Sequence, residues 1–288
     1  MKRLFVAFLI PFMFIITGCG GGGSAEYLPT KPDSSQMARL SESNSDEVAV
    51  ETYGVLLSVN EFQDIPSLRK SNISKRVSAS LQNISLRLLS KRRVSKKCDS
   101  GWATVNELSS SEGYVTYENC VLNGIRLNGK AHVVQYSANS AKIEFDHLRV
   151  EANGESLYIK KAGFLVNDNI FKIEHMYANY ESAKEQVEFL NYNQDVVVDE
   201  YNNLAIISID GYIKTACTKG FVYVKTRPEV QIHTDADYLS GALEISAQGA
   251  KVTIEFDEDG AYITDVDGVQ EYLTYSQIET ELNSLGCK

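Results

Sequence analysis

The chain has 288 residues, of which 43% are hydrophobic and 23% are charged. This is the composition of a globular protein and excludes an intrinsically disordered one. Its 38 acidic residues outnumber 28 basic ones and give a formal net charge of −10. A nucleic acid requires a basic surface for its phosphates, so this balance argues against a nucleic-acid partner.

The N-terminus carries the features of an export signal. Lys2 and Arg3 precede the apolar run Leu4–Ile16, which is shorter than the ~20 residues that a membrane-spanning helix needs. The sequence Ile16-Thr17-Gly18-Cys19 that follows resembles the bacterial lipobox. This resemblance implies removal of residues 1–18 as a signal peptide and attachment of lipid (diacylglycerol, then palmitate or a similar chain) to Cys19. An ordinary signal peptide or a retained membrane anchor would also fit the apolar run alone.

Gly20 follows the lipobox cysteine. In lipoproteins of Gram-negative bacteria an Asp at this position tends to retain the protein in the inner membrane. The resemblance therefore implies a lipid anchor in the outer membrane, facing the periplasm. Residues 19–46 are rich in Gly, Ser, Pro and charge and predict a flexible linker.

Residues 47–97 predict a helical segment, with helices over 47–62 and 65–92. The second helix has one apolar face, formed by Ile73, Val77, Leu81, Ile84 and Leu88. Between 66 and 97 the chain has ten Lys and Arg and no acidic residue. We expect this amphipathic helix to pack on a sheet with its charged side in water. The alternative is that it faces the membrane, anionic lipid or an anionic envelope polymer through Lys75, Arg76, Arg87, Lys91, Arg92 and Arg93.

From residue 98 to residue 288 the apolar pattern has a period of two. Examples are Phe171, Ile173 and Tyr177; Val230 and Ile232; Leu243 and Ile245; and Val252, Ile254 and Phe256. This pattern predicts a mainly β domain of roughly 11–13 strands. We expect a large curved antiparallel β-sheet or open barrel, connected as a meander.

Breaks in the pattern predict bends and turns. Ile143 and Phe145 are in phase, whereas Leu148 and Val150 have the opposite phase, which predicts a bulge or sharp bend between them. Hairpin turns are indicated by dipeptides, namely Asn123-Gly124, Asn128-Gly129, Asn153-Gly154, Asp210-Gly211, Asp259-Gly260 and Asp267-Gly268. Asn123 and Asn128 are too close for both dipeptides to form two-residue turns. Glycines also recur in similar strand-like settings at Gly129, Gly163 and Gly211, at unequal separations that establish no repeat.

A short helix is predicted at the C-terminus. Ser276 and Glu279 have the spacing of a capping box, and Gly286 could end the helix. Its apolar stripe would consist of Ile278, Leu282 and Leu285.

Four cysteines follow Cys19, namely Cys98, Cys120, Cys217 and Cys287. An even number in an exported chain favours disulfides. Three pairings are possible, and we favour Cys98–Cys120 and Cys217–Cys287. Zinc is the rival interpretation, but no Cys-x-x-Cys or Cys/His cluster supports it. The segment Asn119–Gly129, with its Asn-Cys and Leu-Asn-Gly elements, also loosely resembles uncharacterised envelope lipoproteins of Gram-negative bacteria.

No catalytic motif is present. The chain has no Gly-x-Ser-x-Gly, His-Glu-x-x-His or phosphate-binding loop, and its four His residues are scattered. The acidic stretch with Asp257, Asp259 and Asp265 partly resembles a calcium loop, but Glu255 and Val266 occupy ligand positions that the pattern assigns to Asp and Glu. We therefore interpret it as a solvated hairpin and expect no cofactor.

These observations favour a non-catalytic outer-membrane lipoprotein that presents a β-sheet surface for binding or envelope scaffolding. The second hypothesis is a periplasmic lipid or glycolipid carrier with an open concave sheet, like lipoprotein-sorting and lipopolysaccharide-transport proteins. A hydrolase with paired carboxylates is the third. Ligand, partner and oligomeric state are left open.

Overall fold

The structure is a computed structural model that describes residues 28–61, 98–109, 111–122, 125–137, 140–152, 155–167, 170–181, 186–199, 201–233 and 238–284. The lipobox with Cys19, the predicted basic helix 65–92 and Cys287 lie outside the described residues.

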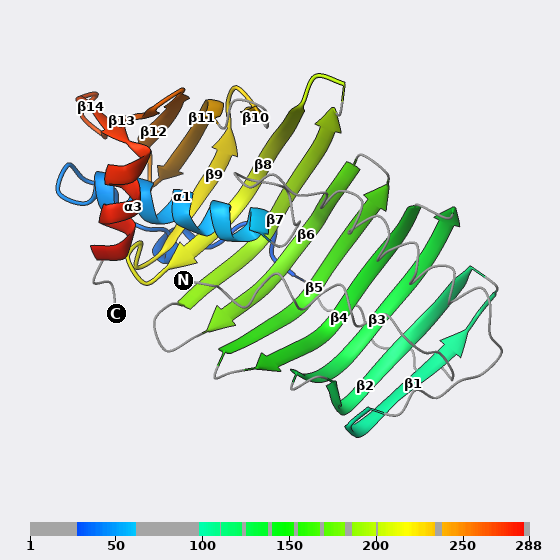
Figure 1. Ribbon diagram of the computed structural model, residues 1–288. Coiled ribbons are helices and arrows are strands. Elements are labelled where there is room, and N and C mark those ends of the chain that lie inside the picture. Colours follow the sequence, from blue (N-terminus) through cyan, green and yellow to red (C-terminus); the bar gives the residue numbers. More distant parts are fainter. Residues whose placement is uncertain are drawn as a thin grey trace.

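One antiparallel sheet of fourteen strands makes up most of the described chain, as Figure 1 shows. The strands are β1 (Ser100–Glu107), β2 (Glu112–Leu122), β3 (Ile125–Ser137), β4 (Ser140–Ala152), β5 (Glu155–Asn167), β6 (Ile170–Glu181), β7 (Gln186–Asp199), β8 (Leu204–Thr215), β9 (Phe221–Thr226), β10 (Val230–His233), β11 (Tyr238–Ala247), β12 (Ala250–Asp257), β13 (Gly260–Thr264) and β14 (Gln270–Thr274). The predicted mainly β, antiparallel meander is confirmed, with slightly more strands than expected.

The meander is interrupted once. β9 and β10 lie end to end between β8 and β11, so that each pairs with both neighbours. The interruption contains the cis Arg227–Pro228 peptide bond. There the Thr226 hydroxyl accepts a hydrogen bond from the N–H of Ile209 at 3.1 Å. This bond satisfies a buried backbone group that the broken strand leaves without a ladder partner.

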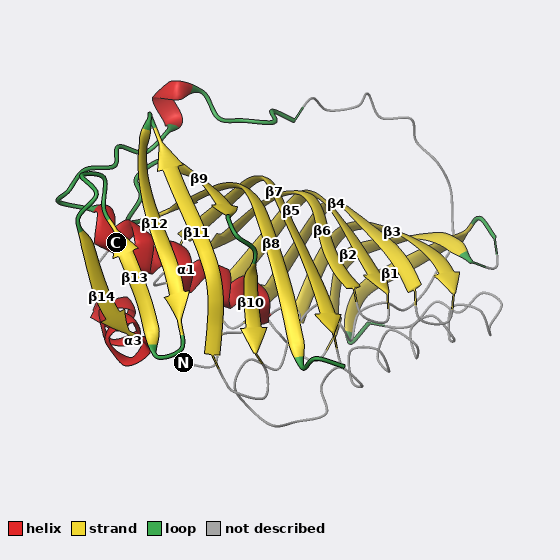
Figure 2. Cartoon of the chain, turned by 90° about the horizontal axis from the view of Figure 1, so that it is seen from above, coloured by secondary structure: helices red, strands yellow, loops and turns green. Residues whose placement is uncertain are grey.

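A row of backbone irregularities crosses strands β1 to β7, at the start of β1 and nearer the middle of the others. Positive φ angles occur at Gly101 in β1, Asn119 in β2, Gly129 in β3, His147 in β4, His175 in β6 and Asn191 in β7. Shifts in strand register accompany the row. Bulges bend strands, and Figure 2 shows the strands curling over into a strongly curved sheet. The bend predicted between Phe145 and Leu148 is confirmed, since His147 belongs to this row.

The bend also corrects two predictions. Asn128-Gly129 lies within β3 and Asp210-Gly211 within β8, so neither dipeptide forms a hairpin turn. In β6 the bulge at His175 shifts the alternation, so that Ile173 before it and Met176 after it are both buried. Tyr177 consequently does not share the face of Ile173, as the simple alternation had predicted.

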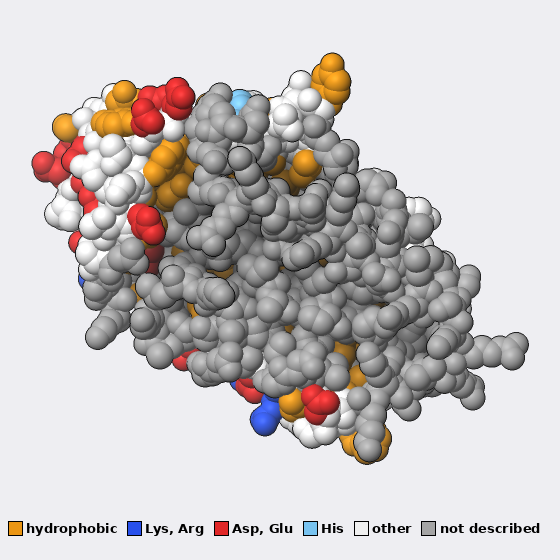
Figure 3. Space-filling model, viewed as in Figure 1, with side chains coloured by type: hydrophobic (Ala, Val, Ile, Leu, Met, Phe, Trp, Pro, Cys, Tyr) orange, Lys and Arg blue, Asp and Glu red, His pale blue; other side chains and the backbone are white. Residues whose placement is uncertain are grey.

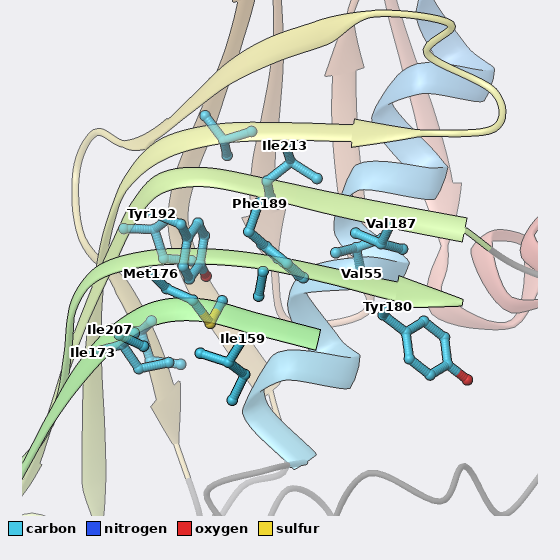
Figure 4. Close-up of a cluster of buried hydrophobic side chains, with 14 of the residues drawn as sticks. Val55, Ile159, Ile173, Met176, Tyr180, Val187, Phe189, Tyr192, Ile207 and Ile213 are labelled. Atoms are coloured by element: carbon cyan, nitrogen blue, oxygen red, sulfur yellow. The ribbon is translucent and has the colours of Figure 1, made fainter. Parts of the chain in front are cut away.

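One face of the sheet is apolar along nearly all of its strands. Buried side chains alternate with more exposed ones in β6, β7, β8 and β12. Figure 4 shows Ile173, Met176, Phe189, Tyr192 and Ile207 pointing into the inside of the curve, from both sides of the bend. Burial raises the pKa of the Tyr192 phenol far above its ordinary value. The fold therefore stabilises itself by burying its concave face.

Two helices pack at the β8–β14 end of the sheet. α1 (Ser45–Glu61) confirms the helix predicted over 47–62 and contacts β8 and β12. Its Tyr53 ring lies 5.4 Å from the ring of Phe256. A Cβ on Gly54 would lie 2.5 Å from the side chain of Leu282, so this glycine permits close contact with α3 (Tyr275–Ser284).

α3 is the predicted C-terminal helix, but its cap differs from the prediction. The Thr274 hydroxyl accepts a hydrogen bond from the Gln277 N–H, and the Gln277 side chain accepts one from the Thr274 N–H. Thr274 and Gln277 therefore form the capping box in place of Ser276 and Glu279. Of the predicted stripe, Ile278 is buried and Leu282 packs against the core, while Leu285 lies outside the described residues.

The predicted flexible linker 19–46 is too long. Met37 forms a bridge with Phe221, and the Ala38 N–H donates to the Phe221 carbonyl at 2.9 Å. Gln248 donates from its side chain to the Met37 carbonyl at 3.0 Å. These backbone contacts fix the segment along the sheet, and composition could not indicate them because they depend on distant residues.

Candidate interaction surface

Four large apolar side chains are exposed on the outside of the sheet at the β1–β3 end, three of them near the β1–β2 turn and Trp102 toward the other end of β1. Trp102 is 69% exposed, Leu108 53%, Tyr114 42% and Tyr136 61%. Single exposed apolar residues are ordinary, but a group at one end of a fold marks an interaction site. We call these four residues the aromatic surface. Trp and Tyr are also the residue types that dominate binding energy at protein interfaces.

The strand register explains why these side chains face outward. Tyr114 pairs with Asn106 of β1 and with His132 of β3. The neighbours Val115 and Val133 are buried, because alternate residues of a strand face opposite sides. Tyr136 has the same parity as His132 and so shares the outer face.

A ladder of charged side chains lies beside the aromatic surface. His132 bridges two carboxylates, with Nε2 2.9 Å from Glu112 and Nδ1 3.0 Å from Glu144. Lys142 continues the ladder to Glu144 at 3.2 Å and to Glu174 at 3.4 Å. We call Glu112, His132, Lys142, Glu144 and Glu174 the charged ladder. It spans strands β2, β3, β4 and β6.

The charged ladder holds its side chains in fixed positions. Hydrogen bonding from His132, and then from Lys142, lowers the pKa of the Glu144 carboxyl, and the hydrogen bond to Glu144 raises the pKa of Lys142. The Tyr114 ring stacks on the His132 ring at 4.3 Å between centroids, with 16° between the planes. The aromatic surface is thus attached to an ordered polar network, which reduces the conformational entropy that binding would cost.

The Cys98–Cys120 disulfide is present and ties the start of β1 to β2, as predicted. Asp99 adds a backbone hydrogen bond to Val121 at 2.7 Å. Cys217 is also disulfide-bonded. Its predicted partner Cys287 lies outside the described residues, so the Cys217–Cys287 pairing stays a prediction.

Acidic side chains concentrate at the opposite end of the sheet, near β12–β14 and α3 (Figure 3). Burial, and then repulsion from Glu271 and Asp265, raises the pKa of Asp46. Burial, and then repulsion from Glu271 and Asp46, raises the pKa of Glu281. These four carboxylates therefore repel one another.

The three calcium candidates do not converge on one site. Asp257 pairs with Gly260 across the tight turn that contains Asp259, at the start of β13. Asp265 follows the other end of β13 and accepts backbone hydrogen bonds from Asp267 and Val269. A five-residue strand is about 16 Å long, so Asp265 is too distant to share an ion with the other two. Among the described residues, no three His, Cys, Asp or Glu side chains form a group that could hold a metal ion.

The basic residues Lys75, Arg76, Arg87, Lys91, Arg92 and Arg93 and the lipidation residue Cys19 lie outside the described residues, so their roles stay predictions. The aromatic surface and the charged ladder were missed by sequence reasoning. Alternation could have grouped Tyr114 with its outward neighbours, but it could not identify which neighbouring strands complete the surface. None of the helices in the described part of the chain has the length and apolarity needed to span a membrane.

Comparison of the chain with protein-family models, with curated proteins and with solved structures found no match.

Proposed function

We propose that this protein is a non-catalytic lipoprotein of the cell envelope that binds a protein partner through the aromatic surface. Cys19 would anchor it in the outer membrane, and the curved sheet would present its outer face to the periplasm. The observation that carries the proposal is the exposure of Trp102, Leu108, Tyr114 and Tyr136 together at one end of the sheet.

Two further features support binding at this outer face. The interior side chains of β2–β8 are buried in the protein by itself, among them Val115, Leu127, Phe145, Ile159 and Phe164. The outer face, in contrast, exposes large apolar groups beside an ordered charged ladder. An interface with an aromatic centre and a charged rim is the usual arrangement for specific protein binding.

Site-specific photo-crosslinking in cells tests this function. A benzophenone amino acid would replace Tyr136 in one variant and Tyr201 in a matched control. Tyr201 is 93% exposed and lies in the β7–β8 turn, away from the aromatic surface. We expect a discrete crosslinked protein from position 136 and none from position 201. Equal products from the two positions, or none from position 136, would contradict the proposal.

The membrane anchor has its own test. Replacing Cys19 with serine removes the thiol that would carry lipid. We expect the wild-type protein to sediment with the outer membrane and Cys19→Ser to remain with the inner membrane as an unprocessed precursor or to appear in the soluble fraction. Unchanged outer-membrane association would refute lipidation at Cys19.

A second candidate is a carrier of lipid or glycolipid, favoured by the apolar concave face. That face continues from β2 to β8, whereas the main contacts of α1 and α3 with the sheet involve β8, β12 and β14. Native mass spectrometry of the full chain extracted from membranes would test it. A carrier should retain lipid mass beyond its own N-terminal acyl groups, and repeated preparations without such mass would count against it.

A further inference from the structure

The two edges of the sheet differ in how they could meet another strand. β1 forms one edge and, among the described strands, pairs with β2 alone. It has eight residues, contains no Lys, Arg or Pro, and has its single charged residue, Glu107, at its end. β14 forms the other edge and has five residues, including Glu271, whose carboxylate repels those of Asp46 and Glu281.

Exposed edge strands are templates for further pairing unless charge, proline or shortness blocks them. β14 is short and lies among carboxylates that would repel a second copy, whereas residues 102–106 of β1 contain no charge and no proline and follow the bulge at Gly101. The Cys98–Cys120 disulfide also holds β1 against β2. An edge strand that is hydrogen-bonded on only one side tends to fray. The disulfide therefore keeps β1 in its strand conformation, with its free backbone groups available for pairing.

We propose that β1 pairs antiparallel with β1 of a second copy of this chain, joining two sheets into one about a twofold axis at Thr104. This inference rests on the proposed function, because it names a second copy as the partner that meets the aromatic surface.

The sequence of β1 suits self-pairing better than pairing with an arbitrary strand. A twofold axis at Thr104 places Thr104 opposite the second copy's Thr104 and Trp102 opposite the second copy's Asn106. Thr–Thr pairs and aromatic side chains stabilise antiparallel pairs. No two like charges oppose each other between residues 102 and 106. Ala103, which is 6% exposed and faces the interior, would stand opposite position 105 of the second copy.

Such an interface would be isologous, with the same surface contributed by both copies. It would place two copies of Trp102 close to the joint on the outer face. The charged ladder begins one strand further in, at Glu112 in β2, and would remain outside the joint. The paired stretch 102–106 therefore contains Trp102 of the aromatic surface, whereas Tyr114 in β2 and Tyr136 in β3 lie further in, and the charges stay in water, where they cost least.

Disulfide trapping tests both the partner and the register. In the full chain, Thr104→Cys would place two thiols opposite each other across the axis, within the Cβ separation of ~5 Å that opposite strand residues have. Thr116→Cys is the matched control, because Thr116 pairs with Thr104 on the same face but one strand further in. On mild oxidation we expect Thr104→Cys to run at about twice the mass of the 32.0 kDa chain on a non-reducing gel, and Thr116→Cys to stay monomeric.

Charge complementation provides the second measurement. Thr104→Lys and Thr104→Glu each place like charges opposite one another and should sediment as monomers in detergent, whereas their mixture should form a heterodimer. Thr104 is exposed, and unfolding temperatures equal to that of the wild type would exclude misfolding. A monomeric wild type at every concentration, or equal trapping of Thr104→Cys and Thr116→Cys, would overturn the inference. If trapping fails while position 136 still crosslinks to another protein, only the self-pairing is wrong and the proposed function stands.

Discussion

The substitution Gly129→Ala tests whether the row of bulges determines the curvature of the sheet. Gly129 has φ +126°, and a Cβ at this position would lie 2.2 Å from the carbonyl oxygen of His147. A non-glycine residue in this backbone region costs about 1–3 kcal/mol. The contact with backbone of β4 adds an overpacking cost of about 1–3 kcal/mol, since neither strand can move without disturbing its ladder. We therefore expect the free energy of unfolding to fall by about 3 kcal/mol or more.

Two glycines serve as controls that separate the causes. A Cβ on Gly163 in β5 would meet Glu174 at 3.4 Å, an ordinary contact, and Gly163 has no positive φ. Gly163→Ala should therefore change stability by less than about 1 kcal/mol. Gly249 has φ +87° with no atom within 4 Å of an added Cβ, so Gly249→Ala isolates the backbone cost, at about 1 kcal/mol.

The assay is urea unfolding, followed by circular dichroism and by the fluorescence of Trp102, the one tryptophan of the chain. The midpoints and slopes give the free energy of unfolding of each variant. We expect Gly129→Ala to be the least stable, followed by Gly249→Ala and then Gly163→Ala. Equal losses for Gly129→Ala and Gly163→Ala would refute the argument that the bend requires this backbone geometry.

Three further predictions concern covalent and titrating groups. Replacing both Cys98 and Cys120 with serine removes the crosslink between residues 22 positions apart. It should lower the free energy of unfolding by about 3 kcal/mol. Amide hydrogen exchange in the folded protein should then increase first in β1. Burial, and then repulsion from Glu271 and Asp46, raises the pKa of Glu281 in the folded state, so the folded protein binds this proton more tightly than the unfolded chain does. The contribution of Glu281 to stability should therefore rise as pH falls toward its ordinary pKa of 4.5. Glu281→Gln should weaken this pH dependence and stabilise the protein by ~0.3–0.5 kcal/mol at neutral pH, as measured by urea unfolding. Burial raises the pKa of Tyr117 and Tyr192 in the folded state, so the unfolded chain loses its phenolic protons at lower pH than the folded protein does. The stability of the protein should therefore fall as pH rises above about 10. Thermal unfolding across alkaline pH measures this, with each Tyr→Phe variant as control, and an unfolding temperature that does not fall would contradict the prediction.

The sequence by itself predicted the features that depend on local periodicity. Val252, Ile254 and Phe256 alternate with polar neighbours and form a strand with those three side chains buried. The phase change between Phe145 and Leu148 predicted the bend at His147. These predictions succeed because a strand has a period of two, which only a bulge can change.

Features that depend on contacts between distant residues were decided by the tertiary structure. Asn128-Gly129 has the composition of a hairpin turn, yet it lies in the bend of β3, because turns and bulges both need positive φ angles. Alternation separates the two faces of β2, but it does not say that Tyr114 would stack on His132. The sequence therefore predicted the alternating strands, the bend at His147 and the Cys98–Cys120 disulfide. Only the packing of the whole sheet decided that β1 is an edge among the described strands, with Trp102 exposed on its outer face.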